Sequence, residues 1–345
     1  MARSRPVAPR PTIGDIAARA GVSKTAVSFA LNGKDGLSEA TRERILQVAD
    51  ELNWRPLRAA QALNRNRFDM VGLVFARPAR TLGVEPFFAQ LISGLQSTLS
   101  TDAIGLQLLI VEDLQSEIEV YRQWASEDRV HGLVITDVRA HDPRFPMLAK
   151  LDLPAVVIGG DDGLKLPSVW VDDHAAMSSI VEYLVALGHR RIGHVAGKPE
   201  FLHTQARDNA IRSLAKGRRL EITTVHTDFS DAEGATATRS ILASRQRPTA
   251  MIYDSDVMAV AGLGVAMEMG VSVPEQVSIV SFDDSVLTQR MHPALSALTR
   301  DTFALGNLVA ATLLEVMAGT ATLPRVQAPT PRLVVRQSTA VVDAG

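Results

Sequence analysis

Between residues 70 and 282, short apolar runs typical of buried strands alternate with segments of helical periodicity, and this alternation constrains the fold most. It predicts an α/β body in which right-handed helical crossovers join parallel strands. The series occurs twice in tandem, so we expect two sheets and two lobes. The predicted strands are 70–75, 106–111, 132–136 and 155–158, then 168–171, 192–195, 250–253 and 277–282. The predicted helices are 87–99, 117–127, 175–187, 205–216, 232–243 and 257–269.

Polar and aromatic residues follow several of these predicted strands. Ligands of open parallel sheets bind at the carboxyl ends of the strands, which here face each other across a cleft. Carboxylates accept hydrogen bonds from hydroxyl groups and aromatic rings pack on C–H faces, so a polyhydroxylated ligand fits. Alternatively the acids cap helices, above all Asp173 and Asp256, whereas Asp283 and Arg207 are stronger ligand candidates. The strand-end groups are Glu85-Pro86-Phe87-Phe88, Gly159-Gly160-Asp161-Asp162, Asp172-Asp173, Asp254-Ser255-Asp256 and Asp283-Asp284.

Charge divides the chain into a basic head and an acidic body. Residues 1–67 carry twelve lysines and arginines against six acids, a net charge of +6. The whole chain has a net charge of −2, so residues 68–345 carry −8. A basic head on an acidic body points to a polyanion that binds the head alone. The alternative is a basic face that is simply solvated.

The head predicts three short helices. Thr12 is placed to cap a first helix that ends at Gly21, Ser23 caps a second over residues 24–31, and Ser38 begins a third. Two short helices joined by a tight turn and braced by a third form a helix-turn-helix, which binds DNA through its second helix. The crossing needs small or apolar residues, here Ala17, Gly21, Val22 and Val27. The outward residues should be polar, here Ser23, Lys24, Thr25 and Ser28.

A basic segment of residues 55–67 links the head to the body. Pro56 suits the first position of a helix, but about two turns of helix are marginal in water because nucleation is costly. We therefore expect this segment to fold only when something holds it. Leu63 is an apolar residue among arginines, as suits a wedge in the DNA minor groove. An ordinary basic linker is the alternative.

Taken together, these residues resemble the LacI/GalR family of bacterial transcription regulators over nearly the whole chain. The resemblance rests on residues 12–32, 38–45, 56–63, 187–197, 273–284 and 293–295. It implies an all-α helix-turn-helix head (1–54), a hinge helix (55–67) and a two-lobed, periplasmic-binding-protein-like body for effector binding and dimerisation (68–345). The expected lobes are about 68–165 with 296–324, and about 166–295 with 325–345.

The resemblance also implies a homodimer that represses transcription by binding a pseudo-palindromic operator. It further implies that the two hinge helices pair and push Leu63 into the minor groove. Phe29 stands where arginine is frequent in the family and cannot bind guanine in the bidentate way, so the operator core should differ. The implied phosphate contacts are Thr12, Ser23, Ser28 and Asn32; the implied base contacts are Lys24, Thr25 and Phe29; the implied linker contacts are Arg58, Ala60 and Leu63.

The effector implied by the family is a small molecule bound between the lobes, and we favour a sugar that releases the operator. A purine or nucleobase co-repressor is the alternative. Ser255 stands where asparagine is usual, and Gly159 where an aspartate is frequent, so Asp161 is a candidate substitute. The implied effector contacts are Phe87, Phe88, Asp161, His203, Arg207, Ser255 and Asp283.

Other classes of protein lack supporting motifs. The chain has no cysteine, no uncharged apolar run of about 18 residues, no Gly-x-Ser-x-Gly and no phosphate-binding loop. Gly262-Leu-Gly-Val-Ala-Met267 lacks the third glycine of a dinucleotide motif, and His189 and His194 have no ligand set around them. We therefore expect no enzyme, no metal and no cofactor.

The basic N-terminus leads into no apolar segment, so a cytoplasmic protein is expected and a sugar-binding transport component is the less favoured alternative. Residues 338–345 hold no leucine heptad, which favours a dimer over a tetramer.

Overall fold

The computed structural model describes residues 11–31, 34–52, 54, 70–78, 85–160, 163–320 and 324–342. The chain separates into two compact units, Met1–Arg67, called the head below, and Phe68–Gly345, called the body. Several predicted contact residues lie outside the described residues, namely Asn32, Arg58, Ala60, Leu63 and Asp161.

The described part of the head contains α1 (Ile13–Ala20), α2 (Lys24–Leu31) and α3 (Glu39–Glu51), which confirms the predicted helices. Thr12 and Asp15 form a reciprocal cap: the Thr12 side chain accepts the Asp15 N–H, and the Asp15 carboxylate accepts the Thr12 N–H at 2.7 Å. Gly21 ends α1 with a φ of 65°, a left-handed conformation that favours glycine. Ser38 caps α3.

The head has a core of its own. Small alanines let α1 and α2 cross closely, and α3 packs against both of them. Arg42 of α3 donates hydrogen bonds to the backbone oxygens of Lys34 (2.7 Å) and Ala30 (3.4 Å), and so ties α3 to the end of α2. The buried core residues are Ile16, Ala17, Ala20, Val27, Ala30, Ile45, Val48 and Ala49.

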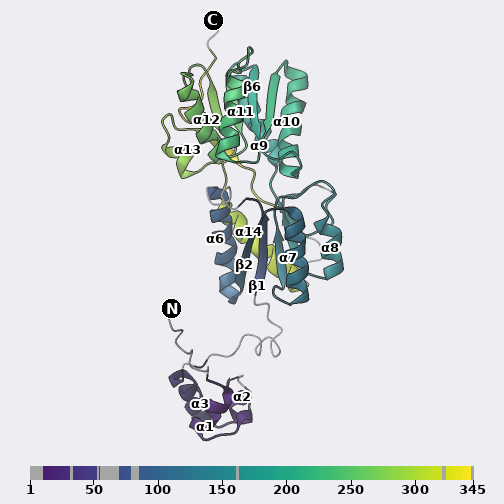
Figure 1. The fold of residues 1–345 in the computed structure, drawn as a ribbon, viewed down its shortest axis with the longest axis vertical. Coiled ribbons are helices and arrows are strands. Elements are labelled where there is room, and N and C mark those ends of the chain that lie inside the picture. Colours follow the sequence, from purple (N-terminus) through teal and green to yellow (C-terminus); the bar gives the residue numbers. More distant parts are fainter. Residues whose placement is uncertain are drawn as a thin grey trace, which may run out of the picture. The chain divides into compact units, whose positions relative to one another are not determined.

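The described residues of the body form two six-stranded sheets with helices on their faces, so the body has two lobes (Figure 1). From edge to edge, the first sheet consists of β11 (Arg325–Gln327), β5 (Ser168–Trp170), β4 (Ala155–Ile158), β3 (Gly132–Ile135), β1 (Met70–Ala76) and β2 (Gly105–Val111). The second consists of β12 (Arg332–Val334), β10 (Ser296–Thr299), β9 (Ser278–Ser281), β8 (Ala250–Tyr253), β6 (Arg191–Ala196) and β7 (Glu221–His226). β12 runs antiparallel to β10, and the other described pairs are parallel, as predicted.

Helices cover both lobes (Figure 1). The first lobe carries α6 (Pro86–Leu99), η1 (Ser100–Asp102), α7 (Leu114–Ser126), α8 (Arg144–Leu151) and α14 (Thr302–Met317). The second carries α9 (Asp173–Ala186), α10 (Leu202–Arg218), α11 (Asp231–Leu242), α12 (Asp256–Glu268) and α13 (Val286–Arg290). No described helix is long and apolar enough to cross a membrane.

The expected lobe boundaries are wrong at three strands. β5 and β11 were expected in the second lobe, but β5 pairs with β4 and β11 pairs with β5, which places both in the first sheet. Residues 296–299 were expected in the first lobe, but they form β10, which pairs with β9 of the second. The chain therefore crosses between the lobes after β5, after β10 and after β11. Hydrogen bonds between strands far apart in sequence decide these positions, and local periodicity does not report them.

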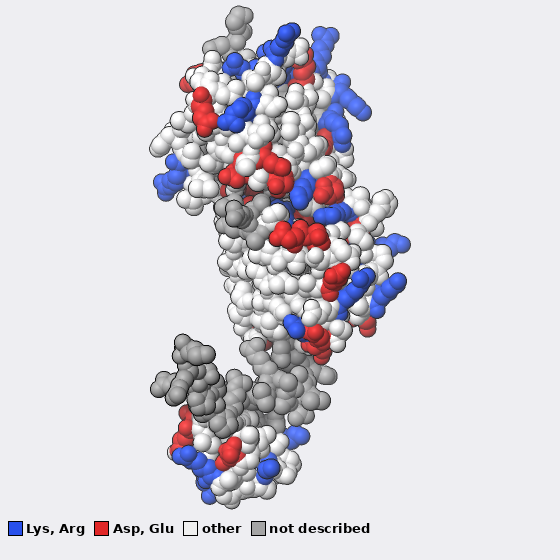
Figure 2. Space-filling model, viewed as in Figure 1, with Lys and Arg blue, Asp and Glu red and all other residues white. Residues whose placement is uncertain are grey.

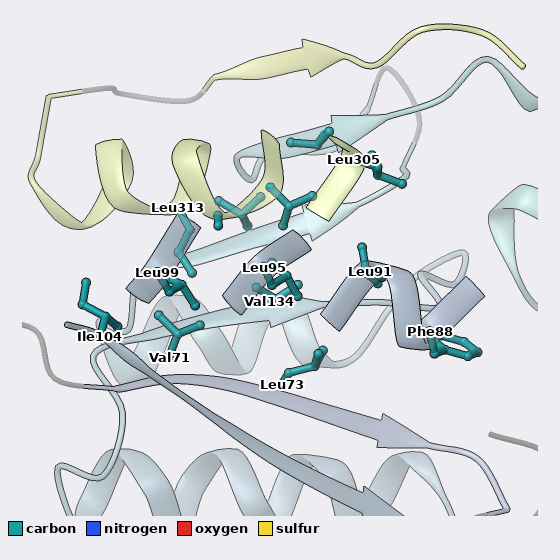
Figure 3. Close-up of a cluster of buried hydrophobic side chains, with 14 of the residues drawn as sticks. Val71, Leu73, Phe88, Leu91, Leu95, Leu99, Ile104, Val134, Leu305 and Leu313 are labelled. Atoms are coloured by element: carbon teal, nitrogen blue, oxygen red, sulfur yellow. The ribbon is translucent and has the colours of Figure 1, made fainter. Parts of the chain in front are cut away.

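In the first lobe, α6 and α14 pack together against the sheet (Figure 3). Their backbones approach closely at two glycines. A Cβ atom on Gly94 would lie 2.1 Å from the Phe303 backbone oxygen, and one on Gly306 would lie 2.4 Å from the Leu91 backbone oxygen. The apolar side chains of this contact include Phe88, Leu91, Leu95, Leu99, Leu305, Val309 and Leu313.

Candidate functional site

The candidate ligand site is a cavity between the two lobes of the body. It lies at the carboxyl ends of the strands, where the sequence predicted a cleft. Phe87, Phe88, His203, Arg207, Ser255 and Asp283, six of the seven predicted effector contacts, line it. Gly159 lines it too. Ligand binding by these residues stays a prediction.

Arg77 connects the two lobes across this cavity. Its Nε and Nη2 atoms donate hydrogen bonds to the Asp137 carboxylate at 2.6 and 2.7 Å, and Nη1 donates to Glu85 at 3.3 Å. The guanidinium lies 5.0 Å from the ring centre of Phe88 in the first lobe and 4.9 Å from that of Phe229 in the second. A buried cation is thus held by two carboxylates and by aromatic faces.

Arg207 of α10 has a similar setting in the second lobe. Nε and Nη2 donate to one oxygen of Asp173 at 3.0 and 2.9 Å, and Nη1 donates to the backbone oxygen of Asp254 at 3.3 Å. The guanidinium lies 3.6 Å from the ring centre of Phe282. These contacts fix its orientation beside the cavity.

Arg300 repeats the arrangement where the chain leaves β10 for α14. It forms an ion pair with Asp283 and lies 4.6 Å from the ring centre of Phe87. Its Nε atom is buried without a hydrogen-bond partner among the described residues. The cavity therefore holds three arginine–carboxylate–phenylalanine units, one of which keeps an unused donor.

Sequence reasoning missed several of these residues. Arg77, Asp137 and Arg300 were not predicted, although Arg77 directly follows a strand and so carried the same signal as the other strand-end groups. The expected capping role of Asp173 is wrong by one residue, because Asp172 accepts the Ala175 N–H that caps α9. That leaves the Asp173 carboxylate to bind Arg207.

The same shift occurs at α12. Ser255 is its cap and accepts the Met258 N–H, so Asp256 is the first helical residue and not the predicted cap. Burial and the nearby charge of Asp283 raise the pKa of Asp256 to about 6. Its carboxylate accepts the Val257 N–H at 2.9 Å.

Burial also shifts the pKa values of two other groups at the cavity. It raises the pKa of Glu85 to about 7, assisted by Asp137, Asp283 and Asp256 against the opposing charge of Arg77. Burial and the charge of Arg207 lower the pKa of His203 to about 4, so this ring is neutral at neutral pH.

A buried histidine lies behind the cavity. His194 of β6 bonds Asp254 at 3.0 Å through Nε2, and its Nδ1 lies 3.5 Å from Asp208, which in turn bonds His226 at 2.9 Å. Burial opposes charge on His194, but the two carboxylates outweigh it and raise its pKa to about 9. The imidazolium and Arg207 keep the pKa of Asp254 well below its usual range.

His189 was considered together with His194 as a metal ligand. It bonds the Thr249 hydroxyl and the Ala340 backbone oxygen at 2.9 and 3.2 Å. The described residues contain no group of three or more acids and histidines that could hold a metal ion.

The candidate surface of the head is the start of α2. Lys24 and Thr25 are exposed there, and Ser23 caps the helix by accepting the Ala26 N–H at 3.2 Å. Phe29 is half-buried, with the Lys34 ammonium 5.9 Å from its ring centre. The other predicted contacts are exposed Thr12 and half-buried Ser28.

A helix-turn-helix head followed by a two-lobed body with a cavity defines a ligand-responsive DNA-binding regulator. Residues 12–56 match the family of bacterial regulatory proteins called lacI, and residues 181–339 match the periplasmic binding protein-like domain. The HTH-type transcriptional regulator reg1 of Streptomyces lividans is 35% identical over 95% of this chain and 96% of its own. The chain therefore belongs to the lacI family of transcriptional regulators, as the sequence resemblance implied.

Solved structures agree with this assignment. The lac repressor dimer bound to operator and the anti-inducer ONPF matches with a TM-score of 0.85 and 25% identity, over 96% of this chain and 100% of that one. A complex of the regulator CelR with cellobiose matches with a TM-score of 0.73 and 28% identity, over 95% and 100%. These matches include the DNA-binding head, which argues against the alternative of a sugar-binding transport component.

Proposed function

We propose that this protein is a homodimeric repressor that leaves its operator when a sugar binds between the two lobes of the body. The proposal rests on the cavity. Its aromatic rings, and its carboxylates and guanidiniums in fixed positions, suit a polyhydroxylated ligand. The cellobiose held by CelR supports a sugar. We assign it regulation and no catalysis, and a bound sugar recovered unchanged is the corresponding check.

The head supplies the DNA contacts. Lys24 and Thr25 are exposed at the start of the second helix of the helix-turn-helix, where side chains reach base edges in the major groove. Thr12, Ser23 and Ser28 are the proposed phosphate contacts. A net charge of +6 on residues 1–67 favours phosphate neutralisation, so operator affinity should fall steeply as salt rises.

The proposed switch is a shift in population between two arrangements of the lobes. A ligand that binds one arrangement better favours it, and the difference in its affinity for the two limits the effect to typically about 1–3 kcal/mol. The residue 55–67 hinge is the proposed transmitter, because a short helix persists only while DNA and its twin hold it.

The variant Arg207→Ala tests the ligand half of this proposal. It removes a side chain fixed beside the cavity, so the sugar should no longer release the operator, while operator affinity without sugar stays within about twofold. Fluorescence anisotropy with DNA from the protein's own promoter region measures both quantities. Arg212→Ala is the matched control, since Arg212 is exposed on the same helix and should respond normally. Sugar release from Arg207→Ala equal to that of the parent would contradict the assignment.

The variant Leu63→Ala tests the hinge half. Loss of the proposed wedge should weaken operator binding by tenfold or more and leave sugar binding unchanged. Unchanged operator affinity would remove the wedge from the mechanism. A purine that strengthens operator binding, where no sugar weakens it, would instead establish the co-repressor alternative.

A further inference from the structure

The charges around the cavity point to the class of sugar that it takes. Among the described residues, the cavity is lined by five carboxylates against three guanidiniums, while His203 is neutral at neutral pH. The carboxylates belong to Glu85, Asp137, Asp173, Asp254 and Asp283. On the face drawn in Figure 2, acidic and basic side chains also gather at the junction of the two lobes.

Each guanidinium already has a carboxylate partner. Arg77 binds Asp137 and Glu85, Arg207 binds Asp173, and Arg300 binds Asp283. The side chains of Arg77 and Arg207 are 5% exposed, and that of Arg300 is 14% exposed, so water screens these pairs little. Among the lining residues that the structure describes, no cation is left over to neutralise a charged ligand.

A phosphate or carboxylate group would therefore meet an unfavourable site. It can accept a hydrogen bond from Arg300 Nε, but the charge of that guanidinium is already balanced by Asp283. To gain a counter-charge of its own, it must displace a carboxylate from its arginine, and that carboxylate would then lack its counter-charge at a high cost in free energy. A hydroxyl group needs no such exchange. It donates a hydrogen bond to a carboxylate that keeps its arginine, and its oxygen accepts from a free donor such as Arg300 Nε.

The surroundings of two acids likewise disfavour added negative charge. Burial and neighbouring carboxylates raise the pKa of Glu85 to about 7, and burial and Asp283 raise that of Asp256 to about 6. An anion at the cavity would add to the same repulsion. The apolar wall, to which Phe87, Ile158 and Leu305 contribute, offers such an anion no compensation and suits the C–H faces of a sugar ring.

We infer that the cavity selects an uncharged sugar and excludes phosphorylated and uronic acid forms of the same sugar. This inference rests on the proposed function, because it specifies the charge of the effector proposed there. The arginines serve to position carboxylates that accept ligand hydroxyls, and do not serve as receptors for an anion.

Matched pairs of sugars test the inference on the full-length protein. Calorimetric titration compares cellobiose, maltose and glucose with their 6-phosphates and with the corresponding uronic acids, at low and at moderate salt. We expect the uncharged member of every pair that binds to bind at least tenfold more tightly. That ratio should change little with salt, because charges inside the cavity are screened much less than exposed ones. A phosphate or uronate that binds as tightly as its uncharged partner overturns the inference.

The variant Glu85→Gln sharpens the test, because it removes one negative charge and keeps the shape and a hydrogen-bond acceptor. It should improve the binding of each anionic member relative to its uncharged partner about threefold to tenfold at pH 8, because a hydrogen bond lost from Glu85 would affect both members alike. Glu119→Gln, the same substitution at an exposed position of α7, should change neither. Equal effects on both members of a pair would overturn the charge argument. If Glu85→Gln does not fold, the affinity ratio within each sugar pair, measured on the unsubstituted protein at both salt concentrations, decides the question.

The operator assay separates the two levels of failure. If only anionic sugars bind and they release the operator, the proposed function stands and the charge inference fails. If no sugar of either kind binds or releases the operator, the proposed sugar response itself fails.

Discussion

The head and the body differ in how far apart in the sequence their functional residues lie. In the head, the core and the exposed side chains of α2 come from residues 12–54, and each helix carries its own cap. In the body, Arg77 contacts Phe229 and Arg300 contacts Phe87, pairs separated by about 150 and 210 positions. The head is therefore built from local signals, whereas the cavity depends on packing that closes over long loops.

The two regions also use charge differently. The head has an excess of basic residues with Lys24 exposed, which suits a partner that is itself a polyanion. The arginines of the cavity are buried against carboxylates, which neutralise their charge within the protein. Arginine content alone would have misread the cavity as an anion site.

The largest effect should come from Gly306→Ala in the body. The new methyl group would lie 2.4 Å from the Leu91 backbone oxygen, so α6 and α14 must separate. We expect the body to lose about 3 kcal/mol of unfolding free energy. Calorimetric unfolding should show this loss in the body transition and leave the head transition unchanged.

Gly264→Ala is the matched control for that variant. Gly264 lies within α12, and nothing is within 4 Å of the position of its Cβ atom. Alanine there should stabilise the body by about 0.5 kcal/mol through helix propensity. If both glycine variants behaved alike, the close approach of α6 and α14 would not be what holds the first lobe.

An effect of the same order is expected from pH, through His194. Its pKa in the folded body is about 9, above the ordinary 6.5, so the protonated form is the one that folding favours. The contribution is complete below pH 6.5 and is lost as pH rises through about 9. It should be on the order of 3 kcal/mol. The charged and titratable groups around His194 are Asp208 and Arg207 of α10, His226 of β7, and Asp254 after β8.

Urea unfolding of the parent and of His194→Gln at pH 6 and pH 9.5 measures this contribution. The free energy of unfolding should fall more between the two pH values in the parent than in the variant, since other groups titrate equally in both. An identical fall in the two proteins would show that His194 is not charged in the folded body.

The smallest effect should come from Ser38→Ala in the head. The Ser38 hydroxyl accepts the Thr41 N–H at 3.3 Å and caps α3, so its loss should cost the head about 1 kcal/mol. Calorimetry should place this loss in the head transition only. Ser244→Ala, at an exposed serine beyond α11 of the body, is the control and should shift neither transition measurably. A shift of the body transition by Ser38→Ala would contradict the independence of the two regions.

Much of the fold was predictable because its signals are local. Thr12, Gly21 and Ser38 bounded the head helices correctly, and the alternation of strands and helices predicted the parallel sheets. No pattern predicted β7, an edge strand whose residues are mostly exposed, or β10 to β12, which are three or four residues long. α8, α13 and α14 were also missed.

The site was predictable in part. Arg207 and Asp283 were singled out as ligand contacts, and they line the cavity. The partners that fix and neutralise these residues were not singled out. Asp173 meets Arg207, and Arg300 meets Asp283, only through the packing of segments that lie far apart in the sequence. A carboxylate that caps a helix and one that binds an arginine look the same in a sequence, as Asp172 and Asp173 show.

The sequence alone determined the helix-turn-helix, the parallel α/β character of the body and the separation of basic from acidic charge. These properties depend on periodicity, caps and composition, which act within a few residues. Only the tertiary structure decided which strands share a sheet and which carboxylate holds each arginine. The physical reason is that ion pairs and strand pairings depend on distances of a few ångströms between segments that the chain order leaves far apart.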